Sequence, residues 1–125
     1  MIKQIPSKEV EAHIKSNPKS VLIDVRTEEE WNADGKPNGE KIALKTHFIT
    51  IQFADGTFNE NFIEDFKKLN IEKDCEVLTM CMGGVRSQMA AELLTKEDYK
   101  CLNISDGFLG NSENMGWKNS GLPCK

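Results

Sequence analysis

The amino-acid sequence predicts an α/β fold with a mostly parallel central sheet flanked by helices on both faces. Short apolar runs that are typical of buried strands alternate along the chain with segments whose apolar residues recur at helical spacing. The chain has 125 residues and contains neither an internal repeat nor a low-complexity segment. We therefore expect a single domain over residues 1–125.

The first predicted helix covers residues 7–16 and is followed by a central strand over residues 21–25. Ser7 is a favourable N-cap residue, because its hydroxyl can accept a hydrogen bond from a free amide of the first turn. Pro18 lies just beyond the expected end and cannot continue the helix. The following strand is short and apolar, as expected for a strand buried on both faces.

A second, shorter helix is predicted after this strand. Thr27 and Glu30 have the spacing of a capping box, and Gly35 is expected to end the helix. The next strand is expected over residues 41–44. Residues 46–57 are the least predictable part of the chain, and within them residues 47–53 alternate like a strand.

The second half of the chain continues the alternation. Apolar residues at helical spacing predict a core-facing helix, and they are Phe58, Phe62, Ile63, Phe66 and Leu69. Strands are expected over residues 76–80 and 100–104, with a helix over 86–94 between them. One helical turn is expected over residues 117–119.

The segment from Cys81 to Ser87 is the strongest functional signal, since it joins a predicted strand to the start of a predicted helix. Backbone amides and the positive end of the helix would converge on Cys81 and favour its thiolate. Gly83 and Gly84 lack a Cβ and allow this close approach, and Arg86 offers a planar fork of donors for an oxyanion.

A cysteine at a strand end is more often a small buried apolar residue than a nucleophile. We keep that interpretation for Cys75 and Cys101. For Cys81, the neighbouring glycines, the arginine and the helix pattern all favour the nucleophile.

The chain resembles the rhodanese-like sulfurtransferases along nearly its whole length. The matching motifs are Leu22-Ile23-Asp24-Val25-Arg26 with Glu30-Trp31, the turn residues Gly35, Pro37 and Gly39, Asn61-Phe62, the cysteine loop, Asp106-Gly107-Phe108, Gly116-Trp117, and Gly121-Leu122-Pro123. Each motif alone is weak, but their order and spacing make the resemblance specific. Loop length is informative as well, because the related phosphatases and arsenate reductases have one more residue than the six from Cys81 to Arg86.

The resemblance implies a sulfurtransferase that moves a sulfane sulfur from a donor such as thiosulfate to cyanide or a cellular thiol. Cys81 would carry the sulfur as a persulfide. Substrate would be bound by Arg86 and by the backbone of the loop, namely Met82, Gly83, Gly84, Val85 and Ser87. Asp24 and Arg26 are interpreted first as charges at a strand end that are either solvated or paired for structure, and the resemblance allows them to support the loop.

Two alternatives stay open at this point. The chain could be a sulfur carrier or binding module that exchanges sulfur with a protein partner, or a phosphatase or arsenate reductase, which the short loop disfavours. Met82 and Val85 make the mouth of the loop less charged than several basic residues would. Glutathione persulfide or a polysulfide can therefore compete with thiosulfate as the donor.

Composition limits the partners, the location and the cofactors that we expect for this protein. A net charge of −4 and a pI near 5.2 argue against a nucleic-acid or anionic-membrane partner. No apolar run approaches the about 20 residues of a membrane span, and the first residues lack a secretory pattern, so a cytoplasmic location is expected. The four cysteines include no Cys-x-x-Cys pair and the two histidines are distant, so we expect neither structural disulfides nor a metal or other cofactor. A monomer is expected, because no coiled-coil seam is present.

Overall fold

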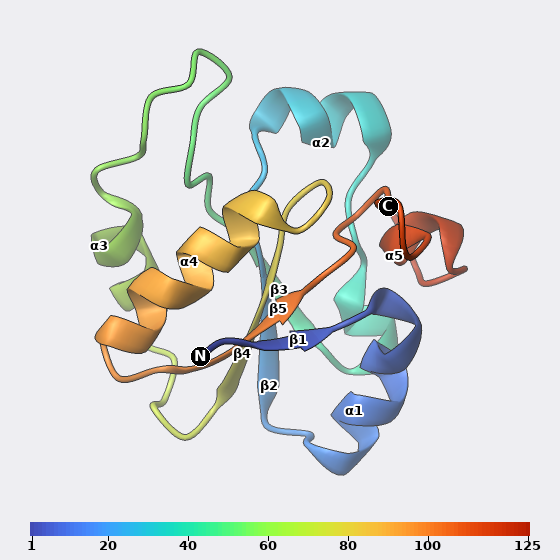
Figure 1. Ribbon diagram of the computed structural model, residues 1–125. Coiled ribbons are helices and arrows are strands. Elements are labelled where there is room, and N and C mark those ends of the chain that lie inside the picture. Colours follow the sequence, from blue (N-terminus) through green and yellow to red (C-terminus); the bar gives the residue numbers. More distant parts are fainter.

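A computed structural model describes all residues from Met1 to Lys125 and contains one five-stranded sheet (Figure 1). The strands are β1 (Lys3–Ile5), β2 (Ser20–Asp24), β3 (Lys45–Phe48), β4 (Glu76–Met80) and β5 (Lys100–Ile104). They lie in the order β1-β5-β4-β2-β3, and every neighbouring pair is parallel. The central position of β4 places the residue after it, Cys81, at the carboxyl edge of the sheet, where α/β proteins bind ligands.

Helices cover both faces of the sheet, as the sequence predicted (Figure 1). They are η1 (Ser7–Glu9), α1 (Val10–Ser16), α2 (Glu28–Asp34), η2 (Gly39–Ile42), α3 (Phe62–Lys67), α4 (Val85–Lys96) and α5 (Gly116–Asn119). α3 and α4 lie on one side, and α1 and α5 on the other. No helix is both long and apolar enough to cross a membrane.

Each face of the sheet has its own hydrophobic core. Along β2, Val21 and Ile23 pack under α3 and α4, whereas Leu22 packs under α1 and α5. This division follows from the alternation of side chains along a strand. The first core includes Cys81, so the loop that begins there starts from a packed side chain. The second core includes Trp117.

Several boundaries agree closely with the sequence analysis. The capping box of α2 is present, with Thr27 and Glu30 bonded reciprocally and Gly35 at the C-terminal end of the helix. The strands predicted over 76–80 and 100–104 are β4 and β5. The helix predicted over 7–16 begins with one 3₁₀ turn, which continues directly into α1. Its N-cap residue is Pro6, so the prediction of Ser7 as the cap is wrong, and the Ser7 hydroxyl instead donates to Asp106.

The strand predicted over residues 41–44 is wrong. This segment lies within or directly after η2, and the strand forms later, as β3. The chain turns here because Ala43 adopts a left-handed conformation (φ 62°) and the Leu44 amide donates to the Gly39 carbonyl. Leu44 is nevertheless fully buried, so its apolar character reflects packing from a turn and not strand pairing.

Two further differences concern short elements. α3 begins at Phe62, so Phe58 belongs to the preceding loop, where it is about half exposed (52%). β1 was not predicted, because it has only three residues and one buried side chain, that of Ile5. It forms by pairing with β5 across almost the whole chain length, which local sequence does not reveal.

Candidate active site

Two hydrogen-bond donors converge on the sulfur of Cys81, at the point where β4 ends and the loop to α4 begins. The Gly84 amide lies 3.2 Å from Sγ, and the Ser87 hydroxyl oxygen lies 3.3 Å from it. Cys81 is only 1% exposed. Gly84 is the N-cap residue of the twelve-residue helix α4, so its amide and the positive end of the helix favour negative charge on the sulfur.

The glycine pair of the loop divides into one indispensable and one tolerant position. Gly84 has φ +110°, and a Cβ there would lie 2.2 Å from the Ser105 carbonyl oxygen. At Gly83 the nearest atom to a Cβ would be the Gly110 carbonyl oxygen, at 3.4 Å. Only Gly84 therefore requires glycine both for its conformation and for its close contact with the neighbouring chain.

The turn after β5 holds the beginning of the loop. The Phe108 amide donates to the Cys81 carbonyl at 2.8 Å, and the Leu109 amide donates to the Met82 carbonyl at 3.1 Å. Gly107 lies so close that a Cβ would be 2.4 Å from the Met82 carbonyl oxygen. The Asp106-Gly107-Phe108 motif thus supports the backbone that presents Cys81.

Ser87 belongs to a buried polar network behind the sulfur. Its hydroxyl oxygen lies 2.5 Å from Oδ1 of Asn103, and the Asn103 amide donates to the Gly84 carbonyl at 3.0 Å. The same amide also donates to Oε1 of Gln4, at 2.8 Å. Asn103 thus links two residues that contact Cys81. Sequence reasoning missed it, although a polar residue between the two apolar residues Leu102 and Ile104 of β5 is a usable signal.

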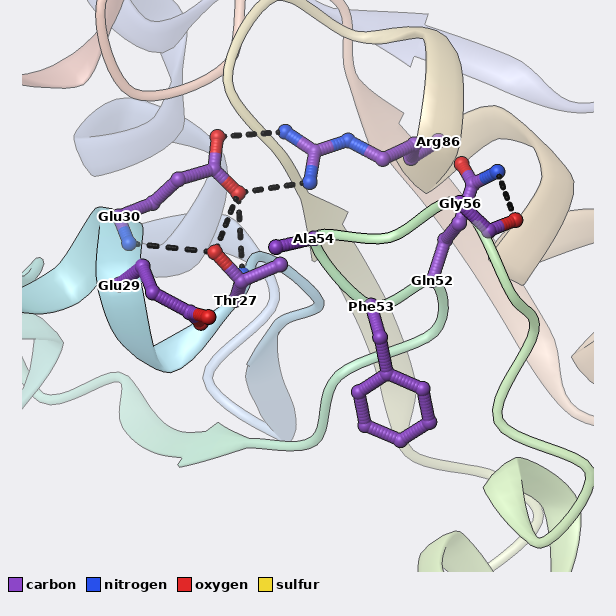
Figure 2. Close-up of a pocket in the computed structure, with 8 residues that line it drawn as sticks. All are labelled: Thr27, Glu29, Glu30, Gln52, Phe53, Ala54, Gly56 and Arg86. Carbon is purple, nitrogen blue, oxygen red and sulfur yellow. Dashed lines mark hydrogen bonds and ion pairs between the residues drawn. The ribbon is translucent and has the colours of Figure 1, made fainter.

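Arg86 makes a two-pronged ion pair with Glu30 of α2 (Figure 2). Its two terminal nitrogens lie 2.7 and 2.8 Å from the two carboxylate oxygens. Glu30 Oε1 also accepts the Thr27 amide and hydroxyl, at 3.0 and 3.1 Å. The sequence identified Glu30 as a capping residue only, because nothing local reveals a partner 56 residues away.

Both side chains of the ion pair are ionised at neutral pH. Burial opposes ionisation of Glu30, but hydrogen bonds from Arg86 and Thr27 outweigh it and lower the pKa of Glu30 to about 2. The hydrogen bonds to Glu30 also raise the pKa of Arg86.

An open pocket of about 430 Å³ borders the ion pair (Figure 2). Its residues come from the start of α2, the loop after β3 and the start of α4, and they are Thr27, Glu29, Glu30, Gln52, Phe53, Ala54, Gly56 and Arg86. The pocket and the cysteine loop share Arg86 as a common wall. Figure 2 shows the Phe53 ring directed away from the ion pair.

Asp24 and Arg26 form a fully buried ion pair, so of the two structural expectations for these charges they are paired and not solvated. The Arg26 guanidinium lies 2.9 Å from Asp24 Oδ2 and donates to the Gly35 carbonyl at 2.9 Å. It also stacks 4.1 Å above the ring of Phe108, whose amide holds the Cys81 carbonyl. Support of the loop by this pair stays a prediction, and Phe108 is the residue through which it would act.

The remaining cysteines lie in other environments. Cys75 is buried, Cys101 is half-buried, Cys124 is exposed, and all are free thiols. Burial raises the pKa of each of the three, which disfavours their thiolates. No group of three or more His, Cys, Asp or Glu side chains is arranged to hold a metal ion.

Sequence comparison identifies similar proteins over most of the chain. Residues 7–114 match the family model described as rhodanese-like domain. The uncharacterized protein RP600 of Rickettsia prowazekii is 39% identical over 109 residues, which cover 86% of this chain and 84% of that protein. A sulfurtransferase of Allochromatium vinosum is 25% identical over 124 residues, which cover 98% and 94% of the two chains.

Comparison of structures points to the same architecture. The crystal structure of Rv0390 from M. tuberculosis has a TM-score of 0.82 and 30% identity, with 98% of this chain and 96% of that chain covered. A rhodanese-like domain protein from Staphylococcus aureus has a TM-score of 0.69 and 22% identity, with 99% of each chain covered. The second comparison supports the fold alone.

Proposed function

The chain belongs to the rhodanese-like domain family, and from this premise we propose that it is a sulfurtransferase in which Cys81 carries the transferred sulfur as a persulfide. The observation that carries the proposal is the convergence of the Gly84 amide and the Ser87 hydroxyl on a buried sulfur at the start of α4. Donors placed this way stabilise a thiolate and then the persulfide anion that replaces it.

The reaction has two displacement steps. In the first, the Cys81 thiolate attacks the outer sulfur of the donor, the donor's sulfur–sulfur bond breaks, and the leaving group departs with the bonding electrons. With thiosulfate the leaving group is sulfite. In the second, cyanide or a thiolate attacks the outer sulfur of the Cys81 persulfide and releases the Cys81 thiolate, so no net oxidation or reduction of the protein occurs.

The short cysteine loop favours this chemistry over that of a phosphatase or arsenate reductase. Six residues run from Cys81 to Arg86. Of the loop amides expected to face the sulfur, that of Gly84 makes a hydrogen bond to it. The resemblance implies that the related phosphatases and arsenate reductases, with one more residue, form a wider ring of amides for a tetrahedral phosphate or arsenate.

Intact-mass spectrometry tests the proposal directly. The reduced protein is incubated with thiosulfate or glutathione persulfide, and its mass is recorded before and after addition of cyanide. We expect a gain of one sulfur that cyanide removes as thiocyanate, and no gain in Cys81→Ser. Cys124→Ser, which removes the exposed thiol, is the matched control and should behave like the parent protein.

A sulfur carrier that works with a protein partner is the second candidate function. It would accept sulfur from a persulfidated protein and fail to turn over with small donors and acceptors. Absence of any Cys81 adduct with small donors and with a persulfidated protein would overturn the sulfur-transfer proposal in both forms.

A further inference from the structure

Arg86 is the cationic residue on which an anionic donor would depend. It is the one Lys or Arg among residues 81–87, and the pocket beside the loop contains no other. That pocket also contains Glu29 and Glu30, so its ionised side chains carry one negative charge more than positive. Among the side chains that line the pocket, only the Arg86 guanidinium can attract an oxyanion by its charge.

Glu30 already occupies that guanidinium. Its two oxygens take both terminal nitrogens of Arg86 at 2.7 and 2.8 Å, the fork geometry that a sulfonate would otherwise use. The Glu30 carboxylate is itself fixed by the amide and hydroxyl of Thr27, at the start of α2. A sulfonate that made the same two-pronged contact would have to displace an oriented, ionised carboxylate.

We infer that Glu30 is a specificity-determining residue that disfavours sulfonate-bearing donors such as thiosulfate, and that the site takes its sulfur from an organic persulfide. This inference rests on the proposed function. In the transfer, the Cys81 thiolate attacks the outer sulfur of R–S–SH, and the sulfur–sulfur bond of the donor breaks. The thiolate R–S⁻ leaves with the electron pair, and the proton stays on the new Cys81 persulfide. No sulfonate takes part, so an already paired Arg86 is no obstacle.

A matched pair of alkyl persulfides tests the inference without a difference in intrinsic chemistry. The persulfides of 2-mercaptoethanol and of 2-mercaptoethanesulfonate differ in a hydroxyl and a sulfonate group. Thiosulfate serves as the third donor. The initial rate of Cys81 persulfide formation is followed by intact mass at low donor concentration. We expect the parent protein to use the hydroxyl donor about fivefold or more faster than the sulfonate donor, since like charge and an occupied guanidinium both oppose the sulfonate.

Glu30→Gln supplies the decisive variant. Glutamine can keep the capping interaction with the Thr27 amide, but it removes the negative charge from Arg86. We expect its rate with both sulfonate-bearing donors to rise about tenfold, while the rate with the hydroxyl donor changes by less than about threefold. Glu28→Gln is the matched control, because Glu28 is exposed in the same first turn and does not line the pocket.

The outcomes separate this inference from the proposed function. If the parent protein uses the sulfonate donor as fast as the hydroxyl donor, and Glu30→Gln leaves the ratio of these two rates unchanged, the inference is overturned while sulfur transfer stands. If Cys81 accepts sulfur neither from any of these donors nor from a persulfidated protein, the proposed function fails. Should Glu30→Gln fail to fold in a thermal melt, the donor ratio of the parent protein still decides, and equal or faster use of the sulfonate donor overturns the inference.

Discussion

The hydroxyl oxygen of Ser87 lies 3.3 Å from the sulfur of Cys81, and both side chains are buried. The same oxygen lies 2.5 Å from Oδ1 of Asn103. One hydroxyl proton can serve only one acceptor at a time, so Ser87 can donate to Asn103 or to the sulfur. As negative charge develops on the sulfur, the hydroxyl can turn towards it, and we therefore expect Ser87 to act as a positioning residue for Cys81.

Ser87→Ala removes one of the two donors that face the sulfur. A hydrogen bond to a charged group contributes about 1.5–3 kcal/mol, so we expect Cys81 persulfide formation to slow by about tenfold or more. The measurement is the initial rate by intact mass, together with the rate of alkylation by iodoacetamide. Ser112→Ala, in an exposed loop, is the control for a serine without such a contact.

A purely structural role for Ser87 would give a different pattern. The variant would then lose stability in urea unfolding while its alkylation rate in the folded state stayed equal to that of the parent protein. The positioning role predicts slower alkylation at a urea concentration where both proteins remain folded.

Alanine substitutions at the two loop glycines should differ strongly in stability. At Gly84 the left-handed φ and the 2.2 Å approach to the Ser105 carbonyl oxygen both oppose a Cβ, so we expect a loss of about 2–4 kcal/mol. At Gly83, where the nearest atom would be 3.4 Å away, the loss should stay below about 1 kcal/mol. Urea unfolding of the two variants checks the difference. Equal losses would contradict the assignment of Gly84 as the demanding position.

Features governed by neighbouring residues were predicted well. The capping box of Thr27 and Glu30 follows from local hydrogen bonding. The succession of strand β4, the Cys81 loop and helix α4 follows from the periodicity of apolar residues. The prediction of a strand over residues 41–44 was wrong, and the reason is again local. Apolar residues at alternate positions suggest a strand, but here a left-handed Ala43 directs them inward from a turn.

Partnerships between distant segments could not be predicted. Asn103 reaches Ser87 because β5 pairs with β4 in a register that the sequence does not state. Glu30 reaches Arg86 because α2 and α4 begin at the same end of the sheet (Figure 1). The cysteine loop could therefore be located from the sequence, whereas the partners of Ser87 and Arg86 became apparent only in the folded arrangement.

Asp106 should be a main determinant of stability, because one buried carboxylate joins both ends of the chain. Its Oδ1 accepts the Ser7 amide and hydroxyl, both at 2.9 Å, and its Oδ2 accepts the Gly116 amide at 2.8 Å. Asp106→Ala leaves the buried Ser7 and Gly116 amides without this acceptor, while the Ser7 hydroxyl keeps the Gly107 carbonyl at 3.3 Å. We expect a loss of about 3 kcal/mol or more in urea unfolding. Ser7→Ala, which removes only the hydroxyl, should lose about 1 kcal/mol. A loss in Asp106→Ala no larger than in Ser7→Ala would contradict this role.

The ion pair of Glu30 and Arg86 predicts a defined pH dependence of stability. The pKa of Glu30 is about 2 in the folded protein against an ordinary value of 4.5, so the folded state favours the ionised carboxylate. The stabilisation is fully present above pH 4.5 and is lost as the pH falls through about 2. We therefore expect the difference in free energy of unfolding between the parent protein and Glu30→Gln to be constant near neutral pH and to shrink between these two values.

Urea unfolding of both proteins over a series of pH values measures this difference. Other carboxyl groups titrate in the same range, but they are common to both proteins and cancel in the subtraction. A difference that stays flat down to pH 2 would mean that Glu30 titrates alike in the folded and unfolded states. The carboxylate would then not be held on Arg86, and the guanidinium would be available to an incoming sulfonate.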